Sequence, residues 1–241
     1  MIFNPINDDM WIPVFQYPIF QKDLSDYFNI PKPKIENPLK KKPVPKIPDS
    51  LELDVNTLSI HISKGNMKLG GITNISLRPE LDCPNCHKCH KECYAQKSYR
   101  QYTNVRKAWG DNSLIARSNV DRFFSQLKQY FNRNKPHYFR IHVGGDFFSQ
   151  QYVDMWLKFA YNHISTKFLA FTKTNFDFSK KPDNFIVIYS QWEGLDIHGN
   201  GIRAWISRDI RTPNKVFQCP SNCEKCLYCF EGKGDVVFKL H

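Results

Sequence analysis

The sequence lacks any apolar stretch of about twenty residues, the length that a helix needs to cross a membrane. Its first residues, Met1-Ile2-Phe3-Asn4-Pro5, also lack the basic start, apolar run and small-residue cleavage site of a secretory signal. We therefore expect a cytoplasmic protein with no membrane partner. In that reducing compartment, clustered cysteines bind metal more often than they form disulfides.

Cysteine is absent outside two short windows, each of which holds four thiols. The first run, residues 83–93, has the spacing C-x2-C-x2-C-x3-C, and the second, residues 219–229, has the same spacing reversed. Chance rarely gathers all the cysteines of a chain in this way, so the sequence predicts metal binding. The predicted ligands are Cys83, Cys86, Cys89, Cys93, Cys219, Cys223, Cys226 and Cys229.

The spacing favours iron–sulfur clusters and leaves zinc as the alternative. Structural zinc sites usually separate two C-x2-C pairs by a dozen or more residues. The first run instead has the spacing of a bacterial ferredoxin, in which three cysteines hold one 4Fe-4S cluster and the fourth reaches another. Clusters shared in this way would join the two runs. His87 and His90 could replace a thiolate, but the cysteines alone are sufficient.

Acidic residues are too few to balance the basic ones. The formal charge is +11, and it falls to about +7 if each run carries a 2− metal–thiolate centre. A basic protein suggests an acidic partner, most commonly nucleic acid. Residues 94–106 also alternate aromatic and basic side chains, as single-strand-binding surfaces do, although an ordinary loop leading into a helix explains them too.

Residues 1–50 differ in composition from the rest of the chain. Pro31–Pro48 holds six prolines and six lysines, which predicts an extended arm. The arm is either a solvated linker or a tether along phosphates or a partner surface. The predicted organisation is this arm followed by a metal-binding α/β domain over residues 51–241.

Short apolar runs alternate with helical patterns in the predicted domain. Helices are expected at 119–133, after a capping box at Ser118, and at 150–163, after Ser149. Strands are expected at 58–62 and 67–75 as a hairpin, and at 138–143, 167–172, 185–189, 202–206 and 236–240. Strands that are apolar on both faces predict a mainly parallel sheet with flanking helices, either open or an incomplete barrel, and the cysteine runs are expected in loops.

Polar residues follow the predicted parallel strands, where ligands bind in such sheets. We expect Arg140 and His142 on one strand face, with Arg140 and Ser190 as candidate cofactor-binding residues. An acid, a base and a cation could converge there, and the candidate catalytic residues are His142, Asp146, Lys173 and Glu193. The alternative is that Arg140, His142 and Asp146 form a structural network.

Several motifs resemble, in this order along the chain, those of the bacteriophage gene product 88 family. They are residues 89–95 (CHKECYA), 139–146 (FRIHVGGD), 168–173 (FLAFTK), 219–226 (CPSNCEKC) and the final VVF at 236–238. The resemblance covers about residues 55–241 and implies a phage or prophage origin and the host cytoplasm. It implies no activity. Extra residues and thiols around Cys83 and Cys86 depart from the family pattern, so the ligand set of the first run stays open.

Two classes of function remain open. Cys219-x3-Cys223-x2-Cys226 has the spacing that leaves one iron open for S-adenosylmethionine in radical enzymes, which predicts a redox or radical enzyme. Its late position in the chain, Lys225 before the third cysteine and the nearby Cys229 count against that chemistry. The other class is a zinc-stabilised module that binds nucleic acid or a phage assembly without catalysis.

Overall fold

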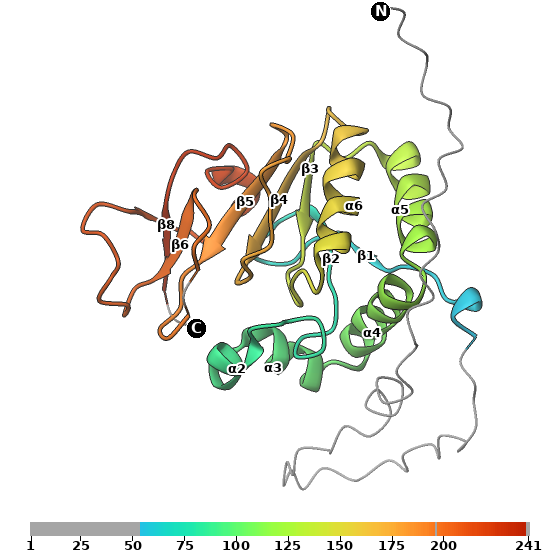
Figure 1. Cartoon of the computed structure of the whole chain (residues 1–241), viewed down its shortest axis with the longest axis horizontal. Coiled ribbons are helices and arrows are strands. Elements are labelled where there is room, and N and C mark those ends of the chain that lie inside the picture. Colours follow the sequence, from blue (N-terminus) through green and yellow to red (C-terminus); the bar gives the residue numbers. More distant parts are fainter. Residues whose placement is uncertain (1–53, 196, 240–241) are drawn as a thin grey trace, which may run out of the picture. The chain divides into compact units, whose positions relative to one another are not determined.

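The computed structural model describes residues 54–195 and 197–239 (Figure 1). The chain divides into two units, Met1–Leu39 and Lys40–His241, and every described residue belongs to the second. The predicted arm therefore lies outside the described residues. The predicted α/β domain is described over nearly all of its length.

The second unit is built on an eight-stranded sheet with the order β1-β2-β3-β4-β5-β6-β8-β7. All neighbours are parallel except β1 and β2. The predicted mainly parallel sheet is confirmed, and it is open because β1 and β7 form its edges. The strands are β1 Ile62–Ser63, β2 Thr73–Ile75, β3 Tyr138–Ile141, β4 Lys167–Thr172, β5 Phe185–Ser190, β6 Arg203–Ile206, β7 Phe217–Gln218 and β8 Val236–Phe238.

The central strands bury apolar side chains on both faces. In β4, Phe168 and Ala170 belong to one hydrophobic cluster, and Leu169 between them belongs to a second cluster. Alternation along a strand sends successive side chains to opposite faces, so the sheet separates two cores. We call the sheet face that carries Phe168 and Ala170 the helical face, and the face that carries Leu169 the open face.

The helical face is covered by α5 (Val120–Asn134) and α6 (Gln150–Tyr161), as the apolar spacing predicted. Both helices pack rings such as Phe123 and Trp156 against the sheet. The cap of α6 is the predicted Ser149, whose hydroxyl accepts from Tyr152 N at 3.2 Å. The cap of α5 is Asn119, however, and the predicted Ser118 instead ends the preceding helix and donates to Leu114 O.

Two further helices, α3 (Tyr94–Gln101) and α4 (Thr103–Ser118), were not predicted. The buried side of α4 carries polar residues. They interrupt the apolar periodicity by which an amphipathic helix is recognised in a sequence. Among them, Asn112 bonds both the backbone N and O of His61, at 2.7 and 2.9 Å, and Ser76 O at 2.9 Å. None of the helices within 54–195 and 197–239 is long and apolar enough to cross a bilayer.

The predicted hairpin exists but is much shorter than its apolar pattern. A 3-10 turn, Val55–Thr57, precedes β1, and only Ile62 and Ser63 pair with β2, opposite Ile75 and Asn74. The intervening residues form a turn closed by a bridge between Asn66 and Gly70. That turn contacts the second cysteine run.

Candidate functional site

The second cysteine run lies on the open face of the sheet. Cys219 follows β7, and Cys223–Cys226 form a single helical turn, α7, whose cap Asn222 accepts from Lys225 N at 3.2 Å. Leu227 then adopts a left-handed conformation (φ 52°) that ends the turn before Cys229. Cys219, Cys223 and Cys229 pack against the cluster that contains Leu169 and Ile188, so the run serves as part of the cover of this face.

The four thiols of the second run interact with one another. The pKa of Cys229 is raised to about 12, chiefly by burial and also by Cys219, Cys223 and Cys226, against the lowering effect of Arg140. Burial likewise raises the pKa of Cys223. Thiolates gathered here would repel one another unless a cation lay among them. The backbone already offers one donor, Ser221 N, at 3.4 Å from Cys219 Sγ.

The position of α7 depends on the turn at residues 68–71. Cys223 N donates to Lys68 O at 2.8 Å. Gly70 has φ +65°, and a Cβ there would lie 2.2 Å from Oε2 of Glu224 and 2.7 Å from its Cβ. Glycine at this position therefore lets the first residues of α7 approach the backbone of the turn.

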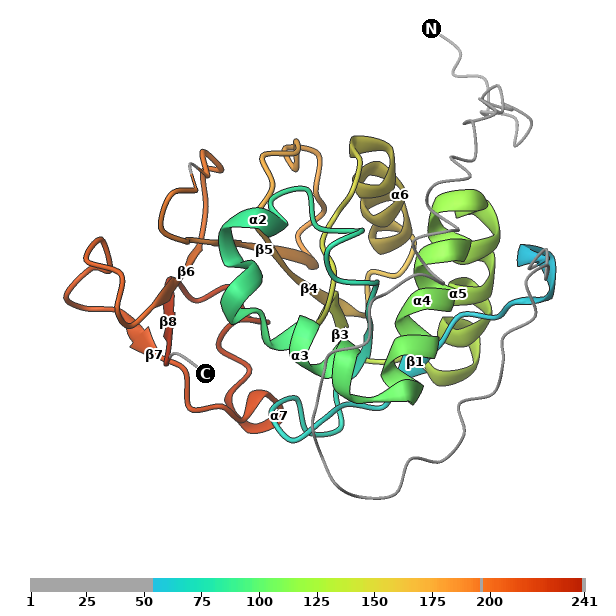
Figure 2. The ribbon, with the colours of Figure 1, turned by 90° about the horizontal axis from the view of Figure 1, so that it is seen from below.

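The first cysteine run lies at the carboxyl edge of the sheet. It comprises α2 (Cys86–Cys89), a 3-10 turn (His90–Glu92) and Cys93, which begins α3. Figure 2 shows α2 and α3 across the ends of the central strands, with α6 on one side and α7 on the other. The residue before the run, Asp82, is fully buried and accepts from Arg117 Nε at 2.6 Å and Ser113 Oγ at 2.5 Å.

The thiols of the first run differ in their protonation. The Cys89 thiol donates to Cys93, which together with the backbone N–H groups of Gln96 and Ala95 lowers the pKa of Cys93 to about 6 despite burial. The same hydrogen bond and burial raise the pKa of Cys89. Burial, and after it Asp146, raises the pKa of Cys83. A thiolate at the beginning of a helix is ready to bind metal.

The thiols of each run are neighbours but do not form finished coordination shells. The structure places all eight cysteines as half-buried free thiols, so the disulfide alternative does not apply to it. Across residues 54–195 and 197–239, no three Cys, His, Asp or Glu side chains are arranged to ligate one metal ion. The predicted ligands are gathered in two places, and their role as ligands stays a prediction.

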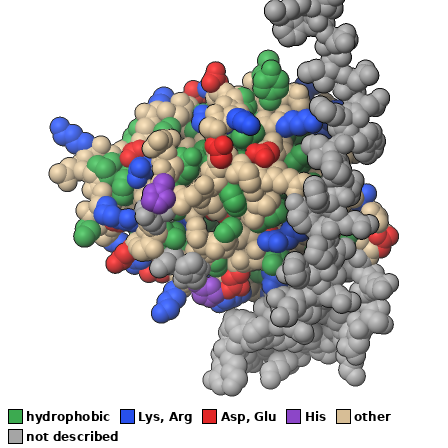
Figure 3. Space-filling model, in the orientation of Figure 1, with side chains coloured by type: hydrophobic (Ala, Val, Ile, Leu, Met, Phe, Trp, Pro, Cys, Tyr) green, Lys and Arg blue, Asp and Glu red, His purple; other side chains and the backbone are tan. Residues whose placement is uncertain are grey.

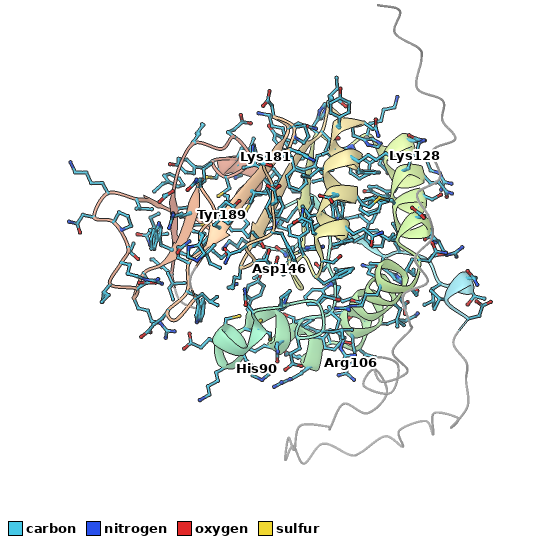
Figure 4. All side chains as sticks on the ribbon, in the orientation of Figure 1. His90, Arg106, Lys128, Asp146, Lys181 and Tyr189 are labelled. Carbon is cyan, nitrogen blue, oxygen red and sulfur yellow. The ribbon has the colours of Figure 1, made fainter. Side chains whose placement is uncertain are left out.

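Asp146 and Lys173, two of the four candidate catalytic residues, lie together beside the first run (Figure 4 labels Asp146 between the strand ends and α2). The buried Asp146 carboxylate accepts from Phe147 N, Thr172 Oγ1 and Lys173 N at 2.7, 2.7 and 2.8 Å. Burial nevertheless raises the pKa of Asp146. Burial lowers the pKa of Lys173, but negative charge at Cys89 and Asp146 opposes burial, and the net shift of this pKa is upward.

The expectation that Arg140 and His142 share a strand face is wrong. Arg140 lies on the open face, with its guanidinium carbon 4.0 Å from the centre of the Phe171 ring. His142 follows the strand with φ +55°, which turns its ring to the helical face, where Nε2 lies 3.1 Å from Tyr152 Oη. Burial lowers the pKa of His142 to about 3, so its imidazole is neutral.

The remaining predicted site residues are Ser190, the last residue of β5, and Glu193, which lies just beyond the strand. Ser190 lies opposite Ala204 on the open face, two residues beyond Ile188. Glu193 is exposed and forms no ion pair with any described residue, so it does not join Asp146 and Lys173. Trp192, which the sequence reasoning missed, lies instead beneath Lys173 Nζ and the Arg208 guanidinium, each 5.8 Å from its ring.

Two more residues that were missed lie close to β3. Tyr94, the residue after Cys93, donates its hydroxyl to Val143 O at 2.6 Å and interacts electrostatically with Arg140. Asn74 of β2 lies opposite Arg140 on the open face. The dipeptide Cys93-Tyr94 is part of the motif at residues 89–95, but the motif did not indicate that the Tyr94 side chain reaches the end of β3.

These features define an open, mainly parallel α/β protein with two thiol-rich segments, one at the carboxyl edge of its sheet and one on a face. A family model described as Gene product 88 matches residues 54–204, and the chain belongs to that family, as the motifs indicated. It is 25% identical over 219 residues to the Gene 88 protein of Mycobacterium phage L5, and 26% identical over 221 residues to that of phage D29. Each alignment covers 74% of this chain and 92% of the relative, which supports a bacteriophage origin. No solved structure matches the chain.

Gly70→Ala should loosen the second cysteine run. The left-handed backbone would cost about 1–2 kcal/mol, and the new methyl group would displace Glu224. We expect alkylation of Cys223 and Cys229 by iodoacetamide, measured by mass spectrometry on metal-free protein, to become about tenfold faster. Gly71→Ala is the control, because its Cβ would meet only the end of the Glu224 side chain, at 3.1 Å. Equal alkylation rates in both variants would contradict this docking.

His142→Asn should make the free energy of unfolding depend less on pH at acidic pH. The folded pKa of His142 lies below its unfolded value, so the unfolded state alone binds a proton between about pH 6.5 and pH 3. Stability therefore falls as the pH drops through this window, by up to about 1.4 kcal/mol per pH unit. The variant should lose that slope in urea titrations, while the same change at the exposed His137 should keep it.

Proposed function

We propose that this protein is an iron–sulfur protein in which each cysteine run binds one cluster beside the sheet. The observation that carries the proposal is the gathering of Cys219, Cys223, Cys226 and Cys229, whose thiols all interact electrostatically. The first run offers the same combination of short turns and neighbouring thiols.

The weakness of α7 as a helix supports a metal there. A four-residue turn is far too short to be stable alone, because helix nucleation is unfavourable. The run nevertheless covers an apolar sheet face, to which it contributes Leu227 and the buried Phe230 as its large apolar side chains. A metal bound to four cysteines would supply the missing constraint, since metal binding to such segments is coupled to folding.

Cationic side chains near both runs suit anionic metal–thiolate centres. Lys173 interacts with Cys89, Cys93 and Cys83, and Arg140 interacts with Cys223 and Cys229. Four thiolates around either zinc or a 4Fe-4S core carry a charge of about 2−. The choice of iron–sulfur over zinc rests on the ferredoxin-like spacing of the first run and its reversal in the second.

The position of Cys229 favours a closed second site over radical chemistry. An open iron for S-adenosylmethionine requires that only three cysteines hold the cluster. Cys229 interacts with all three members of the Cys219-x3-Cys223-x2-Cys226 motif. We therefore assign the second cluster to electron transfer or structural stabilisation.

Protein purified without oxygen should be brown and contain about eight iron and eight sulfide per chain if both clusters are cubanes. Cys226→Ser should remove about half of each, and Lys225→Met, an exposed neighbour in α7, should remove none. Metal and sulfide analysis with visible absorbance measures both. Added S-adenosylmethionine should leave the electron paramagnetic resonance spectrum unchanged.

A colourless protein that carries zinc would replace the iron–sulfur proposal with the zinc-stabilised module. Undiminished metal and stability in Cys226→Ser would remove that residue from the ligand set. A spectral change on adding S-adenosylmethionine would restore the open-site alternative. The first result decides whether the third can be tested, because S-adenosylmethionine can change the spectrum only of a protein that holds a cluster.

Exposed residues at the C-terminal end of α3 and just beyond it support a second candidate function, nucleic-acid binding. Tyr102 is half exposed and lies two residues after the exposed Arg100. Tyr99, another aromatic residue of this segment, is buried. Figure 3 shows basic side chains scattered among acidic and apolar ones on one face, without a continuous basic patch. A continuous basic surface is therefore not visible on this face.

If α3 contacts phosphates, the logarithm of the affinity for single-stranded DNA should fall linearly with the logarithm of salt concentration. Arg100→Ala should reduce the slope by about 0.7, one contact on a single strand. Lys128→Ala on α5 is the matched control and should leave the slope unchanged. Binding that is independent of salt, measured by fluorescence anisotropy, would exclude phosphate contacts.

A further inference from the structure

Arg140 occupies an unusual electrostatic position between the two cysteine runs. It lies in the middle of β3 on the open face, opposite Leu169 of β4 and Asn74 of β2. Its guanidinium stacks on Phe171, and its Nε and Nη2 donate to Ile141 O and His142 O at 3.2 and 3.3 Å. These contacts fix the side chain against the sheet and beneath the second run.

The charge of Arg140 has no carboxylate partner in the described part of the chain. No Asp or Glu oxygen among those residues lies within 4.0 Å of its guanidinium. The groups that interact with it most are Tyr94, Cys223 and Cys229, followed by Asp146. This partly buried cation is stabilised by nearby negative charge, and thiolates of the second run are among the groups that could supply it.

Asn74 provides a second, independent indication of an acceptor at this face. It is 4% exposed, and its Nδ2 has no hydrogen-bond partner among the described residues. Register places it beside Arg140 on the same face of the sheet. Buried amide donors normally have partners, so an orphaned one indicates an acceptor that the polypeptide does not itself provide.

We infer that Arg140 and Asn74 form the polar floor of the second cluster and raise its reduction potential. This inference rests on the proposed function, because it assumes that the second run holds an iron–sulfur cluster. Arg140 is a positioning and tuning residue, whereas Asn74 donates to a thiolate or inorganic sulfide. Sulfur atoms of such clusters accept hydrogen bonds, and these bonds and nearby charge set the potential.

The electron balance gives the direction of the effect. An oxidised 4Fe-4S core on four thiolates has a charge of about 2−, and one electron from a reductant such as dithionite takes it to about 3−. A fixed positive charge and a fixed donor stabilise the more negative state more strongly. Removing either should therefore make reduction harder.

The test is a redox titration of full-length protein under argon, with dithionite as reductant and the spectrum as readout. The second-site transition is the one that disappears in Cys226→Ser. In Arg140→Met we expect at least a tenfold lower reduction equilibrium constant at that transition, a shift of about −59 mV for one electron. Arg140→Lys, which keeps the charge, should change the constant less than threefold.

Asn74→Leu should shift the same transition in the same direction, by at least twofold in the equilibrium constant. Arg133→Met, an exposed change at the end of α5, is the matched control and should leave both transitions in place. Iron content is measured for every variant. If both Arg140 variants lose the second cluster, Asn74→Leu decides: a lowered transition supports the inference, and an unchanged one overturns it.

An unchanged second-site potential in Arg140→Met with full iron content would overturn the inference and leave the proposed function intact. A shift of the same size in Arg133→Met would also overturn it, because the effect would then be one of net charge. A wild-type protein without iron would instead remove the proposed function, and this inference with it. The iron analysis therefore separates the two failures.

Discussion

A parallel sheet has two apolar faces, and the rest of this structure depends on how both are kept from water. Helices α5 and α6 cover one face with regular amphipathic surfaces. The other face, with Leu169 and Ile188 at its centre, is covered by the segment around the second cysteine run, which holds a single helical turn. The cover of this face is too short and too polar to hold its shape by apolar packing alone, which makes its thiols structurally important.

The two cysteine runs approach the sheet from different directions, and each is linked to a residue in or just after β3. The first run reaches the carboxyl edge of β3 through Tyr94, and the second lies on the face of that strand above Arg140. Asp146, at the edge, holds the ends of β3 and β4 together and influences Cys83. The arrangement separates a hydrogen-bonded carboxylate network at the edge from a cation and an amide on the face.

The sequence predicted those parts of the fold that depend on regular periods and missed those set by individual contacts. Strands such as Lys167–Thr172 were predicted with their observed ends, because apolar residues on both faces are typical of a parallel strand. Helix α4 was missed since Asn112 and its neighbours are buried through hydrogen bonds. The prediction that Arg140 and His142 share a strand face was wrong because His142 has a left-handed backbone, which turns its side chain to the other face. A periodic sequence pattern does not indicate such a residue. The short spacing within each run predicts that its cysteines lie close together. It does not predict where the run lies on the sheet.

The position of β8 between β6 and β7 has a consequence for synthesis on the ribosome. Residues 217–238, which are synthesised after the strands that they cover, supply two adjoining strands and the cover of the open face. Until they are released from the exit tunnel, the nascent chain exposes Leu169, Ile188 and their neighbours to water, and partly folded chains with such exposed surface aggregate readily. A chain terminated before residue 217 would therefore lack the cover of this face and would depend on chaperones.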